Sequence, residues 1–127
     1  MKVLLVDDED DFRELLGKRL VKRGLVVSTA GSGEAGLGLA QDGGFDVVVL
    51  DVKMPGMDGL EVLRRLRKIA PDTEVILLTG HANMEVAVEG MDLGAFDYLM
   101  KPVAINELLY KIQDATARRR LRQGRQG

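Results

Sequence analysis

Three acidic residues follow two apolar runs at positions where they could bind a cation and attack phosphorus. Asp7 and Asp8 come directly after residues 3–6, and Asp51 comes directly after residues 47–50. Such runs are typical of buried parallel strands, whose carboxyl ends meet at one edge of an open α/β sheet. Three carboxylates crowded there would repel one another, and a hard cation such as Mg²⁺ would relieve that repulsion. The spacing therefore predicts an acidic metal pocket.

Two further polar residues follow apolar runs in the same way. Thr79 comes after residues 75–78, and Lys101 comes after residues 96–100. A hydroxyl and an ammonium would then face the acids across the edge of the sheet. A carboxylate nucleophile, a metal that screens its charge and two groups for phosphoryl oxygens are the components of phosphoryl transfer. The set favours phosphoryl chemistry, although no member would indicate it alone.

Each of these residues also has a plain structural interpretation. Asp7 and Asp8 could cap a helix and complement its dipole. Asp51 could begin a turn, Thr79 could cap a helix, and Lys101 could be an ordinary surface lysine. All of these interpretations would have to hold together, so the joint arrangement favours the phosphoryl site.

Alternating strand and helix patterns supply the elements that would position these side chains. Negative charge in a first turn and apolar residues at helical spacing predict a first helix that ends at Gly24. A second helix would be capped by Ser32 and run to about Ala40. Of the predicted helices, this one has the least favourable composition, because Gly36 and Gly38 each reduce helix stability by about 1 kcal/mol relative to alanine.

Three further helices complete the predicted α/β pattern. The third precedes Pro71, the fourth runs from an Asn83 cap to near Gly94, and the fifth starts near Ala104. Apolar stripes would pack the third and fifth on the sheet. Their members are Leu60, Leu63, Leu66 and Ile69 in the third, and Ile105, Leu108, Leu109 and Ile112 in the fifth.

The polar motifs occur in a fixed order along nearly the whole chain. They are Asp7-Asp8, Asp51 with Met54-Pro55-Gly56-Met57-Asp58-Gly59, Thr79-Gly80 and Lys101-Pro102. In this order they resemble the receiver domain of two-component response regulators. The resemblance implies a doubly wound five-stranded parallel sheet of order 2-1-3-4-5, in a flavodoxin-like three-layer sandwich. It divides the chain into a receiver domain over residues 1–117 and a basic tail, or the start of a linker, over residues 118–127.

The resemblance assigns the acceptor and the metal ligands. Asp51 would accept a phosphoryl group from a phosphohistidine on a sensor histidine kinase or a phosphotransfer protein. Mg²⁺, the one cofactor implied, would be bound by Asp7, Asp8, Asp51 and the backbone carbonyl of Lys53. Such a domain catalyses only its own phosphorylation and slow dephosphorylation, so we expect a signalling domain and not an enzyme.

The resemblance also assigns a switch. Lys101 would spread the charge of the transferring group, Thr79 would bond a phosphoryl oxygen, and the movement of Thr79 would leave room for Tyr98. The responding surface would be the fourth helix, fifth strand and fifth helix, where phosphorylation would change either self-association, as a homodimer, or the binding of a partner. Gly90 inside the fourth helix would lower the cost of shifting that helix.

Smaller expectations concern the surroundings of the site. The bond between Lys101 and Pro102 is expected to be cis, as the resemblance implies. Lys53 and His81 would flank the path of the hydrolytic water and set the lifetime of the phosphoryl group. Arg13 is expected to be a distant surface residue that has no influence on that lifetime.

Length, composition and charge limit the remaining possibilities. The 127 residues fit one domain, contain no cysteine and include no apolar run near the about 20 residues of a membrane span, so we expect a cytoplasmic protein without membrane contact. Up to Asp114 the chain has 13 basic and 20 acidic residues, and after it come five arginines and no acid. We expect this tail to be the solvated end of the last helix, without nucleic-acid binding, because it has no aromatic residue.

Two other classes of protein share parts of the pattern. A phosphohydrolase of the haloacid dehalogenase type uses a strand-end aspartate with a second acid two residues later, which Asp8 and Asp10 could imitate, but this chain is short for one with a cap insertion. A flavodoxin-like binding module would need a hydroxyl-rich loop where this chain has acids. Residues 78–82 and 93–102 are similar to receivers of nitrogen-regulator-type transcriptional activators, so we expect an output domain outside this chain.

Overall fold

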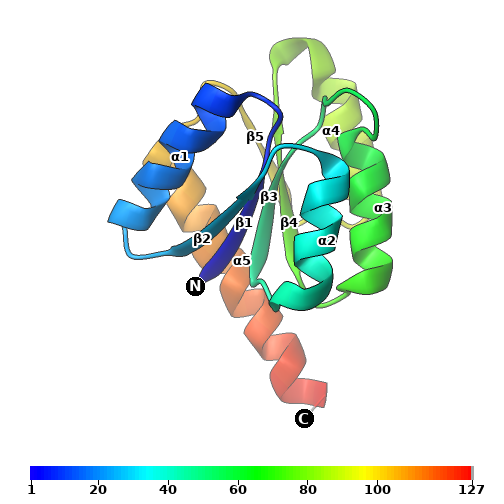
Figure 1. Ribbon diagram of the computed structural model, residues 1–127. Coiled ribbons are helices and arrows are strands. Elements are labelled where there is room, and N and C mark those ends of the chain that lie inside the picture. Colours follow the sequence, from blue (N-terminus) through cyan, green and yellow to red (C-terminus); the bar gives the residue numbers. More distant parts are fainter. Residues whose placement is uncertain (127) are drawn as a thin grey trace.

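The protein is built around one parallel sheet, and the computed structural model describes residues 1–126 of the chain (Figure 1). Five strands pair in the order β2-β1-β3-β4-β5, and every pair is parallel. The strands are β1 (Lys2–Val6), β2 (Val26–Ala30), β3 (Val47–Asp51), β4 (Glu74–Thr79) and β5 (Asp97–Met100). The predicted fold class and strand order are therefore confirmed.

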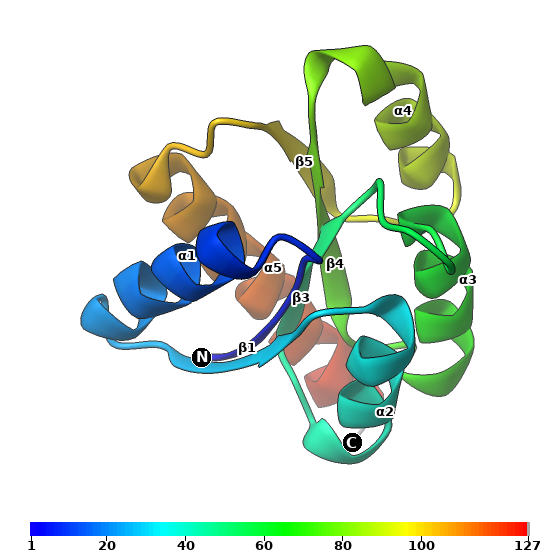
Figure 2. The same ribbon diagram turned by 45° about the horizontal axis from the view of Figure 1, so that its top comes forward.

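Helices cover both faces of the sheet and give three layers (Figure 2). α1 and α5 lie on one face, and α2, α3 and α4 lie on the other. The helices are α1 (Asp10–Lys22), α2 (Gly33–Gly43), α3 (Gly59–Ile69), α4 (Met84–Asp92) and α5 (Ile105–Gln126), with a short 3-10 helix, η1 (His81–Asn83), before α4. No helix in residues 1–126 is long and apolar enough to cross a membrane.

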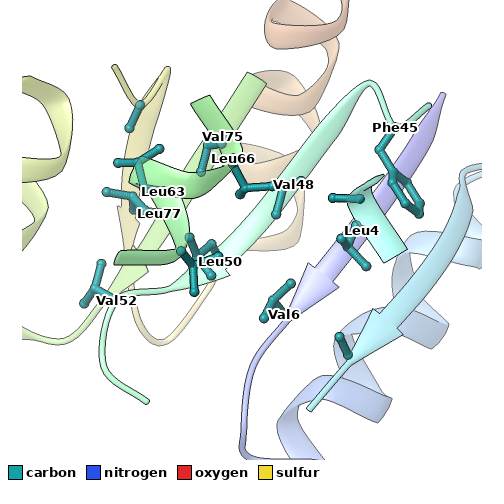
Figure 3. Packing of buried hydrophobic residues seen from close by; sticks show 14 of the residues in the cluster. Leu4, Val6, Phe45, Val48, Leu50, Val52, Leu63, Leu66, Val75 and Leu77 are labelled. Atoms are coloured by element: carbon teal, nitrogen blue, oxygen red, sulfur yellow. The ribbon is translucent and has the colours of Figure 1, made fainter. Parts of the chain in front are cut away.

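Alternation along the strands divides the core between the two faces. Leu4 of β1 belongs to the cluster under α2 and α3, whereas its neighbour Val3 belongs to the cluster under α1 and α5. Figure 3 shows the first cluster, in which strand side chains meet Leu63 and Leu66 of α3. Because the sheet is covered on both faces, its strands are continuous apolar runs, and this is the pattern that reveals them in the sequence.

α2 forms in spite of its glycines and extends past its predicted end. A Cβ at Gly36 would lie 2.8 Å from the Val6 side chain, and a Cβ at Gly33 would lie 2.6 Å from the Val62 side chain. Both glycines therefore let α2 approach the sheet and α3 more closely than any other residue would. Tertiary packing outweighs the low helix propensity of this segment.

α5 continues as a helix through the basic segment and passes the amino edge of the sheet, where β3 and β4 begin (Figure 1). Arg119 Nη1 lies 3.0 Å from Asp46 Oδ1, and Arg122 Nη1 lies 2.6 Å from Glu74 Oε1. Both carboxylate residues are buried. The expectation of a solvated tail is therefore wrong for these two arginines, because buried carboxylates hold them against the domain.

Finer expectations have different outcomes. Ile69 lies at the end of α3 and is 43% exposed, so it does not join the buried stripe of that helix. Asn83 precedes α4, but its side chain makes no capping hydrogen bond. The domain boundary after residue 117 stays a prediction. The side chain of Arg125 and all of Gly127 lie outside the residues that the structure describes.

Candidate functional site

The ends of β1 and β3 bring three carboxylates together. The two strands are neighbours with Val6 opposite Leu50, so Asp7 and Asp51, the next residues, lie at the same edge of the sheet. One oxygen each from Asp7, Asp8 and Asp51 lies within 4.8 Å of the others. Asp7 is fully buried, Asp51 is buried and Asp8 is half-buried. Negative charge is thus concentrated in a place where water screens it poorly.

Lys101 supplies the positive charge of this pocket. The bond between Lys101 and Pro102 is cis, as expected. The Lys101 Nζ lies 3.0 Å from Asp7 Oδ2, 3.6 Å from Asp51 Oδ2 and 3.4 Å from Glu9 Oε1. One ammonium is therefore shared among three carboxylates, which leaves the pocket with an excess of negative charge.

Burial and neighbouring charge shift the pKa values of Asp51 and Lys101. Burial raises the pKa of Asp51 to about 6, and the charge of Asp7 adds to this rise. Lys101 and the Lys53 amide lower it in part. Burial lowers the pKa of Lys101, but the hydrogen bond to Asp7 and the charges of Asp51 and Glu9 outweigh burial, so this pKa is raised overall. At neutral pH Asp51 is therefore ionised at an electrostatic cost, and Lys101 is charged.

The loop between β3 and α3 presents the Asp51 side chain. The Lys53 amide donates to Asp51 Oδ1 at 3.3 Å, and the Gly59 amide donates to the Val52 carbonyl at 3.0 Å. A Cβ at Gly59 would lie 2.6 Å from the Asp51 carbonyl oxygen, so the loop closes only with glycine there. The Lys53 peptide thus lies beside the Asp51 carboxylate, and the role of its carbonyl as a metal ligand stays a prediction.

Thr79 and Tyr98 lie on the adjacent strands β4 and β5. Thr79 is fully buried, and its hydroxyl donates to the Gly80 carbonyl at 3.1 Å. Tyr98 is half-buried and packs against the cluster that α3 also covers. The two side chains have the placement that a switch needs, and their roles in one stay predictions.

Gly90 has a packing role that the sequence did not reveal. A Cβ at this position of α4 would collide with Leu77 Cδ1 of β4. The glycine therefore permits close contact between α4 and the sheet. The expectation that Gly90 lowers the cost of shifting α4 stays a prediction.

The start of α1 makes three contacts with the site that the sequence did not reveal. Glu9 pairs with Lys101, and the Phe12 ring centroid lies 4.4 Å from Lys101 Nζ. Arg13 Nη1 donates to the Asp7 carbonyl at 2.7 Å, so the expectation that Arg13 is distant from the site is wrong. The helical pattern marks Phe12 only as a core residue, and no periodicity rule predicts a bond from Arg13 back to Asp7.

The remaining predicted residues, at the rim of the site, are exposed. Lys53 and His81 are both exposed, and their influence on the lifetime of a phosphoryl group stays a prediction. The Asp10 side chain is 83% exposed and pairs with Arg13 at 2.8 Å. Asp10 therefore stands outside the carboxylate cluster, and a second acid of the dehalogenase type is not found at this position.

The donor set of the pocket fits a hard divalent cation. Its three clustered ligands are carboxylates, the ligand type that Mg²⁺ and Ca²⁺ take, without the thiolate or imidazole that favours zinc. The pocket could hold such a cation while Asp51 keeps an oxygen free to react. Of the predicted site residues, Asp7, Asp8, Asp51 and Lys101 are thus brought together at one edge of the sheet.

Comparison with known proteins agrees with this geometry. Residues 3–113 match the family model of the response regulator receiver domain. The chain is 45% identical to the uncharacterized transcriptional regulatory protein YkoG of Bacillus subtilis over 113 residues, which cover 89% of this chain and 50% of that protein. The chain spans half or less of the curated relatives that it matches.

Solved structures give the same result. A response regulator receiver domain protein from Clostridium thermocellum superposes with a TM-score of 0.90 at 38% identity, covering 94% of this chain and 97% of that one. The receiver domain of NtrX from Brucella abortus superposes with a TM-score of 0.86 at 32% identity, covering 91% of this chain and 98% of that one. Both likenesses extend over nearly the whole chain.

Proposed function

This chain belongs to the response regulator receiver domain family, and from that premise we propose that Asp51 accepts a phosphoryl group. The donor is a phosphohistidine on a sensor histidine kinase or a phosphotransfer protein. One observation carries the proposal: the carboxylates of Asp7, Asp8 and Asp51 lie within 4.8 Å, with Lys101 Nζ 3.6 Å from Asp51. One pocket thus contains a carboxylate nucleophile, further carboxylates that can bind a cation, and a positively charged side chain, which are the groups that phosphoryl transfer needs.

The hydrogen bonds of the pocket favour Asp51 over Asp7 as the acceptor. Asp7 is fully buried, its Oδ1 accepts from the Glu9 amide at 2.9 Å, and its Oδ2 accepts from Lys101 at 3.0 Å. Both oxygens of Asp7 are thus occupied. Asp51 accepts the Lys53 amide on Oδ1 alone, at a longer 3.3 Å, so Asp51 is better able to offer an oxygen to phosphorus.

The transfer is a displacement at phosphorus. An ionised Asp51 oxygen forms the new bond to phosphorus in line with the departing imidazole nitrogen, whose bond to phosphorus breaks. Mg²⁺ held by Asp7, Asp8, Asp51 and the Lys53 carbonyl would neutralise charge on the phosphoryl oxygens. The Lys101 ammonium binds the same group from the side of β5 and spreads its charge. The domain thereby catalyses its own modification and its slow hydrolysis, and acts on no other substrate.

The acyl phosphate changes the surface of the domain through Thr79 and Tyr98. The Thr79 hydroxyl leaves the Gly80 carbonyl and bonds a phosphoryl oxygen, which frees space that Tyr98 takes up. Because Thr79 and Tyr98 lie on neighbouring strands beside α4, this shift biases the surface formed by α4, β5 and α5. A homodimer or another partner then binds the changed surface.

The domain acts as the input part of a longer cytoplasmic regulator. Its curated relatives include transcriptional regulatory proteins at least twice as long as the matched region. An output domain outside this chain would therefore control transcription and bind nucleic acid, a task that this domain itself does not perform.

Phosphorylation of intact protein tests the acceptor. Incubation with acetyl phosphate and Mg²⁺ should add the mass of one phosphoryl group, and chelation of the metal should prevent it. Asp51→Asn should show no addition, whereas Asp42→Asn, at an exposed position of α2, should be modified normally. Modification that persists in Asp51→Asn would exclude the assignment.

Sedimentation and amide exchange test the switch surface. With beryllofluoride as a phosphoryl mimic, the mass in solution or the exchange rates across residues 83–112 should change. If the mass is constant and exchange slows only around Asp7, Asp51 and Lys101, the α4, β5 and α5 surface is not the output.

A further inference from the structure

Arg13 has the contacts of a residue that organises the acidic pocket. It lies in the first turns of α1, yet its side chain is only 20% exposed. Nη1 donates to the Asp7 carbonyl at 2.7 Å, and Nη2 donates to Asp10 Oδ1 at 2.8 Å. The guanidinium also lies over the loop after β2, because a Cβ at Gly31 would lie 3.0 Å from Nη1. One planar group thus ties together three segments of chain.

The bond to the carbonyl completes the constraints on Asp7. The Asp7 amide donates to the Ala30 carbonyl at the end of β2, at 3.1 Å. Its carboxylate is fixed by the Glu9 amide and by Lys101. The carbonyl, past the end of β1, takes its hydrogen bond from Arg13. Every polar group of Asp7 is therefore oriented, and the peptide that joins Asp7 to Asp8 is oriented with it.

We propose that Arg13 is a positioning residue for cation binding. By fixing the peptide between Asp7 and Asp8, its guanidinium sets the directions in which both carboxylates face the cation. This inference rests on the proposed function of the pocket and adds a residue to it. Only an arginine can bridge a carbonyl and a carboxylate with one rigid fork, whereas a lysine offers a single ammonium.

Substitution of Arg13 should change Mg²⁺ affinity in opposite directions if Arg13 acts by its position or by its charge. A positive charge near the pocket repels a cation, so a guanidinium that acted only by its charge would weaken Mg²⁺ binding, and Arg13→Met would tighten it. In that case Arg13→Lys would leave the affinity unchanged. If Arg13 acts by position, both variants should bind Mg²⁺ more weakly, by about tenfold, as is usual when an outer partner of a metal ligand is lost.

Calorimetric titration of the full chain with MgCl₂ at constant ionic strength distinguishes these cases. Arg19→Met and Arg19→Lys are matched controls, because Arg19 is an exposed arginine of the same helix. Circular dichroism confirms that each variant is folded at the titration temperature. An unchanged or tighter affinity in Arg13→Met would overturn the proposal, as would an equal loss in the Arg19 variants.

Two further measurements separate positioning from general destabilisation and from failure of the proposed function. At saturating Mg²⁺, the phosphorylation rate of Arg13→Lys should return to within about twofold of the parent, because a displaced ligand set lowers affinity first. In metal-free protein, the Glu9 amide should exchange faster in both Arg13 variants, and unchanged exchange would exclude the role of Arg13 even if the parent bound no Mg²⁺. If the parent protein bound no Mg²⁺ while the Glu9 amide exchanged faster in the Arg13 variants, the proposed function would be contradicted and the positioning role of Arg13 would not.

Discussion

The two edges of the sheet both carry buried carboxylates, but each edge neutralises them differently. At the amino edge, Asp46 faces Arg119 at 3.0 Å and Glu74 faces Arg122 at 2.6 Å. Arg118 adds a third guanidinium, 3.8 Å from Glu74. The Asp46 carboxylate also accepts from a backbone amide at 2.8 Å. Each acid here has at least one arginine of its own.

At the carboxyl edge the balance is reversed. Asp7, Asp8 and Asp51 cluster within 4.8 Å, and Lys101 is the cation that the described residues place among them. The same lysine also pairs with Glu9. Burial raises the pKa of Asp51 to about 6 and the neighbouring Asp7 adds to this rise, which reflects the cost of a buried negative charge beside another.

The difference separates a structural polar cluster from a functional one. Carboxylates with their own guanidinium groups need no ligand, so the amino edge acts to hold the end of α5 on the domain. Carboxylates that share one ammonium retain negative charge that a bound cation can compensate, so the carboxyl edge is prepared for chemistry. β3 connects the two clusters, because Asp46 directly precedes this strand and Asp51 ends it.

The largest expected effect is at the amino edge. Arg119→Met would leave the Asp46 side chain, 11% exposed, with an uncompensated charge. Loss of one partner from a buried ion pair costs about 3 to 5 kcal/mol, and we expect about 3 kcal/mol of lost stability because both groups retain slight exposure. Urea unfolding measures it, with the exposed Arg120→Met of the same helix as control. A loss no larger than that of the control would remove the distinction between the edges.

The acceptor provides the converse test at the carboxyl edge. Without metal, Asp51→Asn should raise the free energy of unfolding on the order of 2 to 3 kcal/mol above pH 6, because the folded pKa of about 6 lies above the unfolded value of 3.8. The folded state then binds the proton more tightly, so the cost of ionised Asp51 is fully present above pH 6. It declines as the pH falls toward 4.

Urea unfolding of both proteins between pH 4 and pH 8 measures this difference. Saturating Mg²⁺ should narrow the difference in unfolding free energy, because the cation binds more tightly to the protein that retains the Asp51 carboxylate and so stabilises it more. A difference that is constant across this pH range would show that Asp51 carries no electrostatic cost, and the contrast between the edges would then rest on geometry alone.

A smaller effect is expected where α4 packs beside the carboxyl edge. Gly90→Ala should destabilise the protein by about 1 to 2 kcal/mol although alanine favours helices, because the added methyl group collides with Leu77. Gly38→Ala is the matched control, since a Cβ there meets nothing within 4 Å and should stabilise α2. Equal stabilisation by both substitutions would favour the interpretation of Gly90 as a point of flexibility.

The smallest expected effect concerns the rim of the acceptor site. Lys53→Ala and His81→Ala should each change the dephosphorylation rate several-fold, equivalent to about 1 kcal/mol, because both side chains are exposed and follow Asp51 and Thr79 by two residues. Loss of phosphate from the purified phosphoprotein measures the rates. Arg19→Ala replaces Arg13 as the reference, since Arg13 contacts the site. If both variants lost phosphate at the rate of Arg19→Ala, neither rim residue would influence hydrolysis, and the reaction would depend on the buried residues alone.

Most of the fold and the central site were predictable because they depend on local patterns. Apolar runs mark strands buried on both faces, and the residue that follows each run lies at the carboxyl edge, so the positions of Asp7, Asp51, Thr79 and Lys101 follow from chain order. α2 was less predictable, because the presence of Gly33 and Gly36 is explained by close packing on Val62 and Val6 and not by helix propensity.

The sequence by itself therefore determined the element order, the parallel sheet and the carboxylates that meet at its carboxyl edge, because hydrophobic periodicity and strand ends are properties of neighbouring residues. Only the tertiary structure decided which charges are paired. The bond of Arg13 to Asp7, and the pairing of Arg119 with Asp46 across 73 residues of chain, follow no periodic spacing. They exist because the packing of α1 and α5 on the sheet brings these groups together, and that packing assigns one edge to stability and the other to chemistry.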